Sequence, residues 1–382
     1  MKKLIYILNS YSSKSDQHYF HVINLLEEIA RNDVHIALVI EKCQDLPIVD
    51  NENISIHAIN ADISKYKRPV ELIKILNRLY NLGYRKVFTR ISKSGILISI
   101  VFSFFRSKVE TYYWHSGTVF DFNRRVKSTI ALLKDDIEFW FIKSFVTVFV
   151  TGPESMKQYY NKVVGVKESK ILILYNDINL SRFDSDQREE RKEKNQKLKL
   201  DLEDKIILFV HRLSPVRETL YYLPFVLEKF YEVGEFDNYV SVIIGGGSDK
   251  EELEKLIENS PYKERIRVLG PKPNAIIQDY YSVANIFINP TMAEGFPRVV
   301  IEAEAMGLPI VSTDAGGIRD IVPNEQQRYV VDKKDREGFA DALIDLAKKT
   351  EVQQELRIIN RKYVSKFSTE NVAKMYVREL FK

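Results

Sequence analysis

The chain alternates short apolar runs with segments of helical periodicity from one end to the other, and this alternation limits its fold more than any other feature. Each run is rich in Val, Ile, Leu, Phe or Tyr, which is typical of strands buried on both faces of a parallel sheet. The helices between such strands make right-handed crossovers, so we predict an α/β protein with two Rossmann-like parallel-sheet domains. The first set of runs covers residues 3–9, 34–41, 54–60, 86–91, 110–116, 146–151 and 170–176, and the second covers residues 205–211, 239–246, 265–270, 285–290, 309–314 and 328–332.

A polar segment separates the two sets of runs. Residues 181–204 are highly charged and contain almost no large apolar side chains. We therefore predict an N-terminal domain at 1–180, a charged linker at 181–204, a C-terminal domain at 205–365 and a final crossover helix at 366–382.

Composition narrows the class of protein. Apolar residues make up 45% of the chain and charged residues 29%, which is typical of a globular protein. The single cysteine, Cys43, excludes a disulfide framework and favours a reducing compartment. The longest apolar run, residues 95–105, is about half the ~20 residues that a membrane-spanning helix needs. We expect a cytoplasmic protein without a transmembrane helix.

Positive charge is concentrated in the first half of the chain. Residues 1–180 hold 25 Lys and Arg against 18 Asp and Glu, and the remainder holds 32 against 35. The densest stretch, Lys65 to Lys93, has nine basic residues and one acid, and it places Val70, Ile73, Leu76 and Leu79/Tyr80 at helical spacing. This helix either lies on an anionic membrane or buries its apolar stripe in the core. The charges are not interleaved with aromatic residues, so we expect no nucleic-acid partner.

The stretch "NPTMAEGFPRVVIEAEAMGLPIVSTDAGG", residues 289–317, reads as a strand end, a loop and a helix. Pro297 suits a helix start, helix N-termini bind anions, and Gly295 lets a ligand approach the backbone. Glu294 and Glu302 would then accept hydrogen bonds from sugar hydroxyls. Alternatively, Glu294 is a partner of the helix dipole and Glu302 a surface residue, and the residues alone leave both readings open.

This stretch resembles the signature of the family-4 retaining glycosyltransferases of GT-B fold, glycosyl transferases group 1, and the resemblance extends over nearly the whole chain. It implies two Rossmann-like domains facing across a cleft, with the C-terminal helix returning to the N-terminal domain. It also implies that Glu294 contacts the donor sugar and that Glu302 binds the nucleotide ribose. The backbone that would hold the sugar hydroxyls and the diphosphate belongs to Gly295, Phe296, Pro297, Arg298 and Val299.

Two further segments of the second half are similar to family motifs. "FVHRLSPVRETLYYL" places Arg212 at the family arginine and Arg217 where a lysine is usual, with Glu218 where a glycine is usual. These cations would stabilise the leaving nucleoside diphosphate. "VIIGGGSDKEEL" matches the family's Gly-x-Gly turn near the nucleotide, with Gly246 as the donor-binding residue. It does not fit the dinucleotide pattern, because Lys250 occupies the third glycine position.

The first half carries weaker matches. "TYYWHSGT" resembles the strand-end histidine segment, which would place His115 near the donor sugar as a catalytic residue; a structural role is the alternative. The loop after the first strand has no glycine, whereas many members have a Gly-Gly pair there. His18 and His21 are spaced i, i+3, but no acidic or cysteine partner accompanies them, so we predict no metal site.

The resemblance implies a retaining, metal-independent glycosyltransferase without a cofactor. Its donor would be a nucleoside-diphosphate sugar, with UDP as the expected nucleotide. Its acceptor would be a glycan or a lipid-linked glycan in cell-envelope polysaccharide or glycolipid biosynthesis, reached by peripheral association of Lys65–Lys93 with the inner face of the membrane. A GT-B-fold nucleotide-sugar epimerase and a non-catalytic nucleotide-sugar-binding protein remain the alternatives.

Overall fold

The computed structural model describes residues 1–12, 20–115, 117, 129–183 and 205–382. These residues form two compact units. The first contains residues 1–12, 20–115, 129–177 and 369–382, and the second contains Gly117 with residues 178–183 and 205–368. Each unit is built around its own parallel sheet, so the predicted fold class, two parallel-sheet α/β domains, is confirmed. Most of the predicted linker, from residue 184 to 204, lies outside the described residues.

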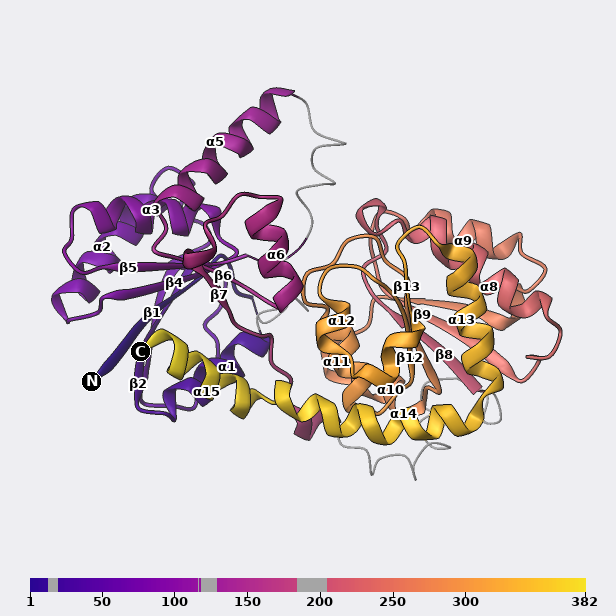
Figure 1. The fold of residues 1–382 in the computed structure, drawn as a ribbon. Coiled ribbons are helices and arrows are strands. Elements are labelled where there is room, and N and C mark those ends of the chain that lie inside the picture. The colour runs from indigo at the N-terminus through magenta and orange to yellow at the C-terminus, as the bar shows by residue number, and fades with distance from the viewer. Residues whose placement is uncertain (13–19, 116, 118–128, 184–204) are drawn as a thin grey trace. The chain divides into compact units, whose positions relative to one another are not determined.

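The first unit is a seven-stranded sheet in which every neighbouring pair is parallel (Figure 1). The strand order is β3-β2-β1-β4-β5-β6-β7, so the chain winds outward in one direction from β1 and then in the other. This change of direction lies between β1 and β4. The strands are β1 (Lys2–Leu8), β2 (Val34–Cys43), β3 (Ile54–Asn60), β4 (Lys86–Arg90), β5 (Glu110–Trp114), β6 (Val148–Thr151) and β7 (Ile171–Ile173).

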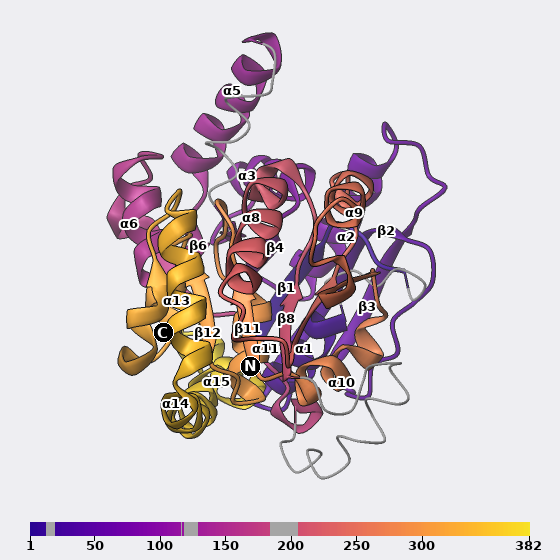
Figure 2. The same cartoon turned by 90° about the vertical axis from the view of Figure 1, so that its right-hand side faces the viewer.

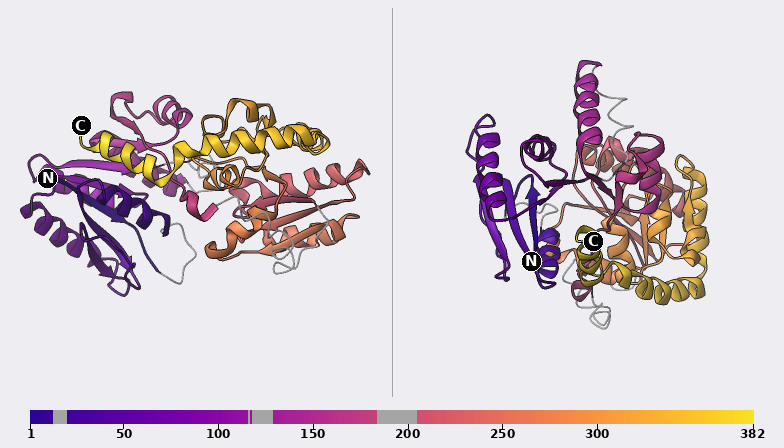
Figure 3. Two further views of the ribbon diagram at one scale, coloured as in Figure 1. Left: turned by 90° about the horizontal axis from the view of Figure 1, so that it is seen from below. Right: turned by 60° about the vertical axis from the view of Figure 1, so that its left-hand side comes forward.

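Helices cover both faces of this sheet. One face packs against α1 and α15 and the other against α2 and α3, and Figure 3 shows the C-terminal α15 lying beside α1. The return of the final helix to the N-terminal sheet is therefore confirmed. The helical segments are α1 (Phe20–Ala30), α2 (Arg68–Asn81), α3 (Lys93–Phe104), α5 (Thr129–Phe145), α6 (Glu154–Lys162), α15 (Thr369–Leu380) and the single turn η1 (Glu168–Lys170).

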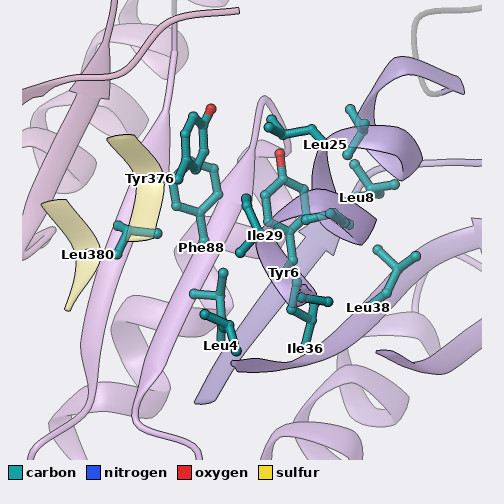
Figure 4. Packing of buried hydrophobic residues seen from close by; sticks show 14 of the residues in the cluster. Leu4, Tyr6, Leu8, Leu25, Ile29, Ile36, Leu38, Phe88, Tyr376 and Leu380 are labelled. Atoms are coloured by element: carbon teal, nitrogen blue, oxygen red, sulfur yellow. The ribbon is translucent and has the colours of Figure 1, made fainter. Parts of the chain in front are cut away.

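Figure 4 shows how α15 completes the core under β1. The ring of Tyr6 stacks on Phe88 with centroids 5.0 Å apart, and Phe88 lies 5.8 Å from the ring of Tyr376. Side chains from three strands and two distant helices thus share one apolar layer. The labelled members are Leu4, Tyr6, Leu8, Leu25, Ile29, Ile36, Leu38, Phe88, Tyr376 and Leu380.

The apolar stripe predicted for α2 is partly wrong. The helix buries Leu72, Leu76 and Leu79 against the sheet, whereas Val70 is 52% exposed and Ile73 is 41% exposed. Both sets have helical spacing, so periodicity alone did not show which row faces the core. The helix therefore has a buried apolar row and a second, outward-facing one.

The second unit is a six-stranded parallel sheet in the order β10-β9-β8-β11-β12-β13. Its chain direction also reverses beside the first strand of the unit, between β8 and β11. The strands are β8 (Lys205–Val210), β9 (Tyr239–Ile244), β10 (Ile266–Gly270), β11 (Ile286–Asn289), β12 (Ile310–Thr313) and β13 (Val330–Val331).

The main helices of this unit are α8, α9 and α13, which pack on one face of the sheet, and α10 and α11, which lie on the other (Figure 2). None of the helices in the described residues is long and apolar enough to cross a membrane. The helical segments are η2 (Leu180–Phe183), η4 (Pro215–Arg217), α8 (Thr219–Glu232), α9 (Lys250–Glu258), η5 (Lys263–Arg265), η6 (Asn274–Ile276), α10 (Ile277–Val283), α11 (Arg298–Ala305), α12 (Ile318–Ile321), η7 (Asn324–Tyr329), α13 (Arg336–Lys348), α14 (Thr350–Tyr363) and η8 (Val364–Phe367).

Candidate active site

The loop between β11 and α11 carries most of the predicted donor-binding residues. It spans residues 290–297 at the carboxyl end of β11. The Thr291 N–H donates to Thr313 Oγ1 over 2.9 Å, and that hydroxyl donates to the Thr291 carbonyl over 2.5 Å. The loop is thereby tied to the end of β12. Open α/β sheets bind ligands at this edge, where the chain direction reverses.

A second glycine-containing turn supports this loop from behind. The Gly317 N–H donates to the Gly295 carbonyl over 3.0 Å. Gly316 has φ +63°, and a Cβ at that position would lie 2.4 Å from the Glu294 carbonyl oxygen. Only glycine fits there, because the backbone is left-handed and the neighbouring chain leaves no room for a side chain. The "TDAGG" end of the sequence signature therefore shapes the backbone at Glu294.

The Glu294 carboxylate is only 9% exposed and is held by two basic side chains. Its Oε1 lies 2.5 Å from His211 Nε2 and 3.3 Å from Arg217 Nε. The Arg212 backbone N–H donates to His211 Nδ1 over 2.7 Å, so the ring proton resides on Nε2 and is donated to Glu294. Burial alone would raise the pKa of Glu294, but His211 and Arg217 outweigh it and hold the pKa below its usual value. The group is a buried carboxylate in its ionised form.

The second predicted carboxyl, Glu302, lies just over one turn into α11 and is 6% exposed. The Tyr281 hydroxyl donates to its Oε2 over 3.1 Å. Burial raises the pKa of Glu302, while the positive charges of Arg298 and Arg182 and the Tyr281 hydrogen bond oppose that rise. Two carboxyl groups eight residues apart therefore have opposite pKa shifts, which is common where ligands bind.

The backbone at the start of α11 has no side-chain cap. Pro297 occupies the capping position without a capping hydrogen bond, and the first turn contains no acidic residue. The first N–H groups of a helix have no partner within the helix, so they favour an anion. The Phe296 ring is buried and packs edge-on against Phe367, with centroids 5.5 Å apart. This packing anchors the Gly295–Val299 backbone.

The structure brings Glu294, Arg217, Glu302 and the Gly295–Val299 backbone together in the second unit, but it does not bring in every predicted group. The Arg212 side chain is exposed, and its guanidinium forms no ion pair within the described part of the chain. Its backbone, in contrast, fixes the His211 ring. The positive charge beside Glu294 comes from Arg217, and His211 adds a hydrogen bond.

Gly246 lies in the turn after β9, and its carbonyl accepts the Leu213 N–H over 3.0 Å. A Cβ at Gly245 would lie 1.8 Å from the His211 carbonyl, and one at Gly247 would lie 1.9 Å from the Leu213 carbonyl. The two flanking glycines thus let this turn pack directly on the loop that carries His211. The role of Gly246 in nucleotide binding stays a prediction.

His115 belongs to the first unit and directly follows β5. Its Nδ1 lies 2.6 Å from the Tyr160 hydroxyl, and the rings of Tyr113, Phe139 and Phe149 surround it. Burial, reinforced by the charge of Lys93, lowers its pKa to about 4. The imidazole is therefore neutral near pH 7. Its catalytic role stays a prediction, as does the contribution of the first loop, because residues 13–19, with His18, lie outside the described residues.

Sequence reasoning missed three residues of the site: His211, Tyr281 and Arg182. His211 had a detectable signal, since it ends a predicted strand next to Arg212. Tyr281 had none, because an aromatic residue in a helix looks like a core residue. Arg182 lies in the segment interpreted as linker. Among the residues that the structure describes, no group of three or more His, Cys, Asp or Glu is arranged to hold a metal ion.

Comparison with known proteins identifies the family. Residues 190–363 match the family described as glycosyl transferases group 1. TuaC of Bacillus subtilis, named as a glycosyltransferase of teichuronic acid biosynthesis, is 32% identical over 52% of this chain and 46% of its own length. The chain thus spans about half of that relative. CapM of Staphylococcus aureus, a capsular polysaccharide biosynthesis glycosyltransferase, is 22% identical over 93% of this chain and 94% of its own.

A solved structure supports the fold over the full length. HepE of Anabaena, crystallised with UDP, aligns with a TM-score of 0.75 over 100% of this chain and 99% of its own, at 13% identity. At that identity the likeness shows the fold alone. Together with the sequence match, it shows that residues 190–363 belong to glycosyl transferases group 1, the family-4 glycosyltransferases, and that the chain has their GT-B fold.

Proposed function

We propose that this protein is a retaining glycosyltransferase that moves a sugar from a UDP-sugar donor to a hydroxyl group of a cell-envelope glycan. The observation that carries the proposal is the buried, ionised Glu294 carboxylate, held by His211 and Arg217 next to the uncapped start of α11. An apolar core does not need a buried charged group, because burial of a charge is costly. Such a group is needed in a site that stabilises a positively charged sugar beside a departing diphosphate.

The donor is held by groups of the second unit. Glu302 accepts hydrogen bonds from two ribose hydroxyls, and the Gly295–Val299 backbone binds the diphosphate and the sugar hydroxyls. Arg217 faces the diphosphate, where negative charge grows as the glycosidic bond breaks. Arg212, whose side chain is exposed, reaches the same group when the donor binds. The crystallised complexes of HepE with UDP and with UDP-glucose support UDP as the nucleotide.

Transfer with retention follows from attack on the face that the leaving group vacates. The bond from the anomeric carbon to the phosphate oxygen breaks, and its electron pair leaves with UDP. The acceptor oxygen then bonds to the same face of that carbon, and its proton passes to the departing phosphate oxygen. Glu294 stabilises the positive charge of the sugar electrostatically, and His211 holds the carboxylate in position. The cationic side chains and the helix start take the part that a metal would play, so we propose that transfer needs no metal.

His115 is proposed to contact the donor sugar from the first unit. Because its pKa is lowered to about 4, the ring is a hydrogen-bonding group and not a cation at neutral pH. Its bond to Tyr160 fixes the orientation of the ring.

The acceptor is proposed to be a glycan or lipid-linked glycan at the inner face of the membrane. The basic stretch Lys65–Lys93 on the first unit supports attraction to anionic lipid, at about 1 kcal/mol per basic residue near the surface. TuaC and CapM are named for cell-envelope polysaccharides. Sedimentation with anionic vesicles tests the association: binding at low salt that weakens at high salt is expected, and absence from the pellet at both would refute it.

The transferase activity is tested by incubating the protein with UDP-glucose, UDP-galactose and UDP-N-acetylglucosamine and measuring UDP release with and without acceptor glycans. An acceptor-dependent release of UDP from one donor, with an α-linked product by NMR, is expected. Interconversion of the UDP-sugar without any acceptor would favour an epimerase instead. Binding of UDP without turnover of any donor would favour a non-catalytic binding protein.

A further inference from the structure

Two hollows in the first unit lie end to end between α2 and α3. The smaller has a volume of about 180 Å³, and its lining includes Glu41, Lys42, Lys65, Arg68, Ser94 and Ile98. The larger has a volume of about 400 Å³, and its lining includes Ile73, Leu97, Ile98, Val101, Phe102 and Phe105. Ile98 borders both, so the two hollows meet at one side chain. We refer to them together as the α2–α3 groove.

The polar end of the groove lies at the carboxyl edge of the sheet. Glu41 is near the end of β2, and Ser94 is in the first turn of α3, directly after β4. These strands flank β1 on its two sides, where the chain direction reverses. Sheets of this kind bind their ligands at that point.

The polar end is cationic. Lys42, Lys65 and Arg68 line it, and in the described part of the chain none of the three forms an ion pair. The one acidic group, Glu41, is 5% exposed, and its oxygens accept hydrogen bonds from Ser92 and Ser94. The Arg68 guanidinium donates one hydrogen bond to the Ala61 carbonyl over 2.6 Å, which leaves its charge without a carboxylate partner among the described residues. Three such cations beside one hydrogen-bonded carboxyl favour an anionic group such as a phosphate.

The other end is lined mainly by apolar side chains. From Ser94 to Phe105 the chain of α3 advances eleven residues, which is about 16 Å along a helix. Val101 is 45% exposed and Phe105 75% exposed, although both line the hollow. Asn77 and Arg106 are the polar residues of that lining. An apolar hollow that is open to solvent marks a binding surface.

We propose that the α2–α3 groove binds a lipid phosphate lengthwise, with the phosphate on Lys42, Lys65 and Arg68 and the hydrocarbon chain along Ile98, Val101 and Phe105. This proposal rests on the proposed function, since it names the acceptor class: a glycan carried on a lipid phosphate. The charge and the apolar surface are arranged in the order in which a lipid phosphate carries them. The exposed apolar row of α2, through Ile73, is then one wall of the site.

Calorimetric titration tests the proposal with three probes: farnesyl phosphate below its micelle concentration, farnesol, and inorganic phosphate. Farnesyl phosphate is expected to bind at least tenfold more tightly than either of the others, because only it engages both ends of the groove. A titration with UDP on the same preparation reports separately on the second unit.

Four single variants locate the site. Val101→Asp puts a carboxylate in the apolar end, and Lys65→Glu reverses a charge in the polar end; each should weaken farnesyl phosphate binding at least tenfold and leave UDP binding unchanged. Val163→Asp and Lys67→Glu are the matched controls. Val163 is 65% exposed at the end of α6, Lys67 is two residues from Lys65, and neither lines the groove, so both should bind within about twofold of wild type.

Several results would overturn the proposal. Absence of farnesyl phosphate binding, with UDP bound normally, would refute the groove and leave the proposed function intact. Equal affinity for inorganic phosphate would show that the hydrocarbon chain of farnesyl phosphate contributes nothing to binding. Equal losses of affinity in the control variants would show general adsorption to a basic surface. Farnesyl phosphate binding without any UDP binding would refute the acceptor assignment together with the proposed function.

Discussion

Three glutamates within eleven residues have three different environments. Glu294 is ionised between His211 and Arg217, and Glu302 accepts a hydrogen bond from the Tyr281 hydroxyl. Neither carboxyl oxygen of Glu304 has a hydrogen-bond partner among the residues that the structure describes. Burial raises the pKa of Glu304 well above its usual value, and the positive charge of Lys366 opposes that rise without cancelling it. Burial in the core therefore favours the protonated form of Glu304, while the other two carboxyl groups face the proposed ligand. This contrast provides a matched pair of substitutions.

Glu294→Gln keeps the shape of the side chain and removes its charge. We expect turnover of the UDP-sugar to fall by about a hundredfold or more, as it does when one electrostatic group of an active site is lost. UDP affinity should change by less than about threefold, because the carboxylate faces the sugar. Glu304→Gln is the control, with turnover near wild type. Undiminished turnover in Glu294→Gln would remove Glu294 from the mechanism.

Glu304→Gln also makes a prediction about stability. The folded chain holds the Glu304 proton more tightly than the unfolded chain does, so unfolding becomes easier as pH rises above about 4.5, by up to about 1.4 kcal/mol per pH unit until the folded pKa is reached. Glu304→Gln has no titrating group at this position, so its free energy of unfolding does not fall with pH for this reason. Urea unfolding should therefore show a stability advantage of the variant that grows from pH 4.5 to pH 7. A pH-independent difference would mean that Glu304 is ionised in the fold.

At the level of the elements, the site depends on the close approach of two turns. Gly316→Ala would push a methyl group to within 2.4 Å of the Glu294 carbonyl, so the loop carrying Glu294 must shift. We expect kcat to fall at least tenfold. Gly234→Ala is a matched control: it has φ +71° but no atom within 4 Å, so it has the strain of about 1 kcal/mol without the collision. Equal activity in the two variants would contradict this account.

The sequence predicts elements better than it predicts side-chain partners. All thirteen predicted runs contain a strand, because runs such as 205–210 and 239–244 consist mainly of apolar residues. The sequence does not predict which side chains meet in long-range contacts. His211 and Glu294 are 83 residues apart in the chain, and only the parallel neighbours β8 and β11 bring their loops together. The sequence also did not show which apolar row of α2 faces the core, because both rows of the helix have helical spacing.

At the scale of the whole molecule, the last helix is part of the first unit. Val372, Ala373, Tyr376 and Leu380 of α15 are buried in the core under β1. The chain therefore leaves the second unit near residue 368 and completes the first one. Residues 369–382 are therefore needed for the stability of the first unit.

Tyr376→Ala should test this dependence. Loss of a buried aromatic ring costs about 3–5 kcal/mol. Hydrogen exchange should speed up in β1, α1 and β4, while peptides of β8 to β12 and UDP affinity stay unchanged. Lys374→Ala, an exposed position on the same helix, is the control and should match wild type. Faster exchange spread equally over both sheets would contradict the division into two units.

The central claim is that the second unit binds a nucleoside diphosphate through Glu302, Arg217 and the start of α11. The most direct measurement is a calorimetric titration of the purified protein with UDP, GDP, ADP and NAD, each with and without a chelator. The account predicts micromolar or tighter binding of one nucleoside diphosphate, UDP, that the chelator does not change. A preference for NAD, or no binding of any nucleotide, would contradict the claim, and abolition of UDP binding by the chelator would refute metal independence.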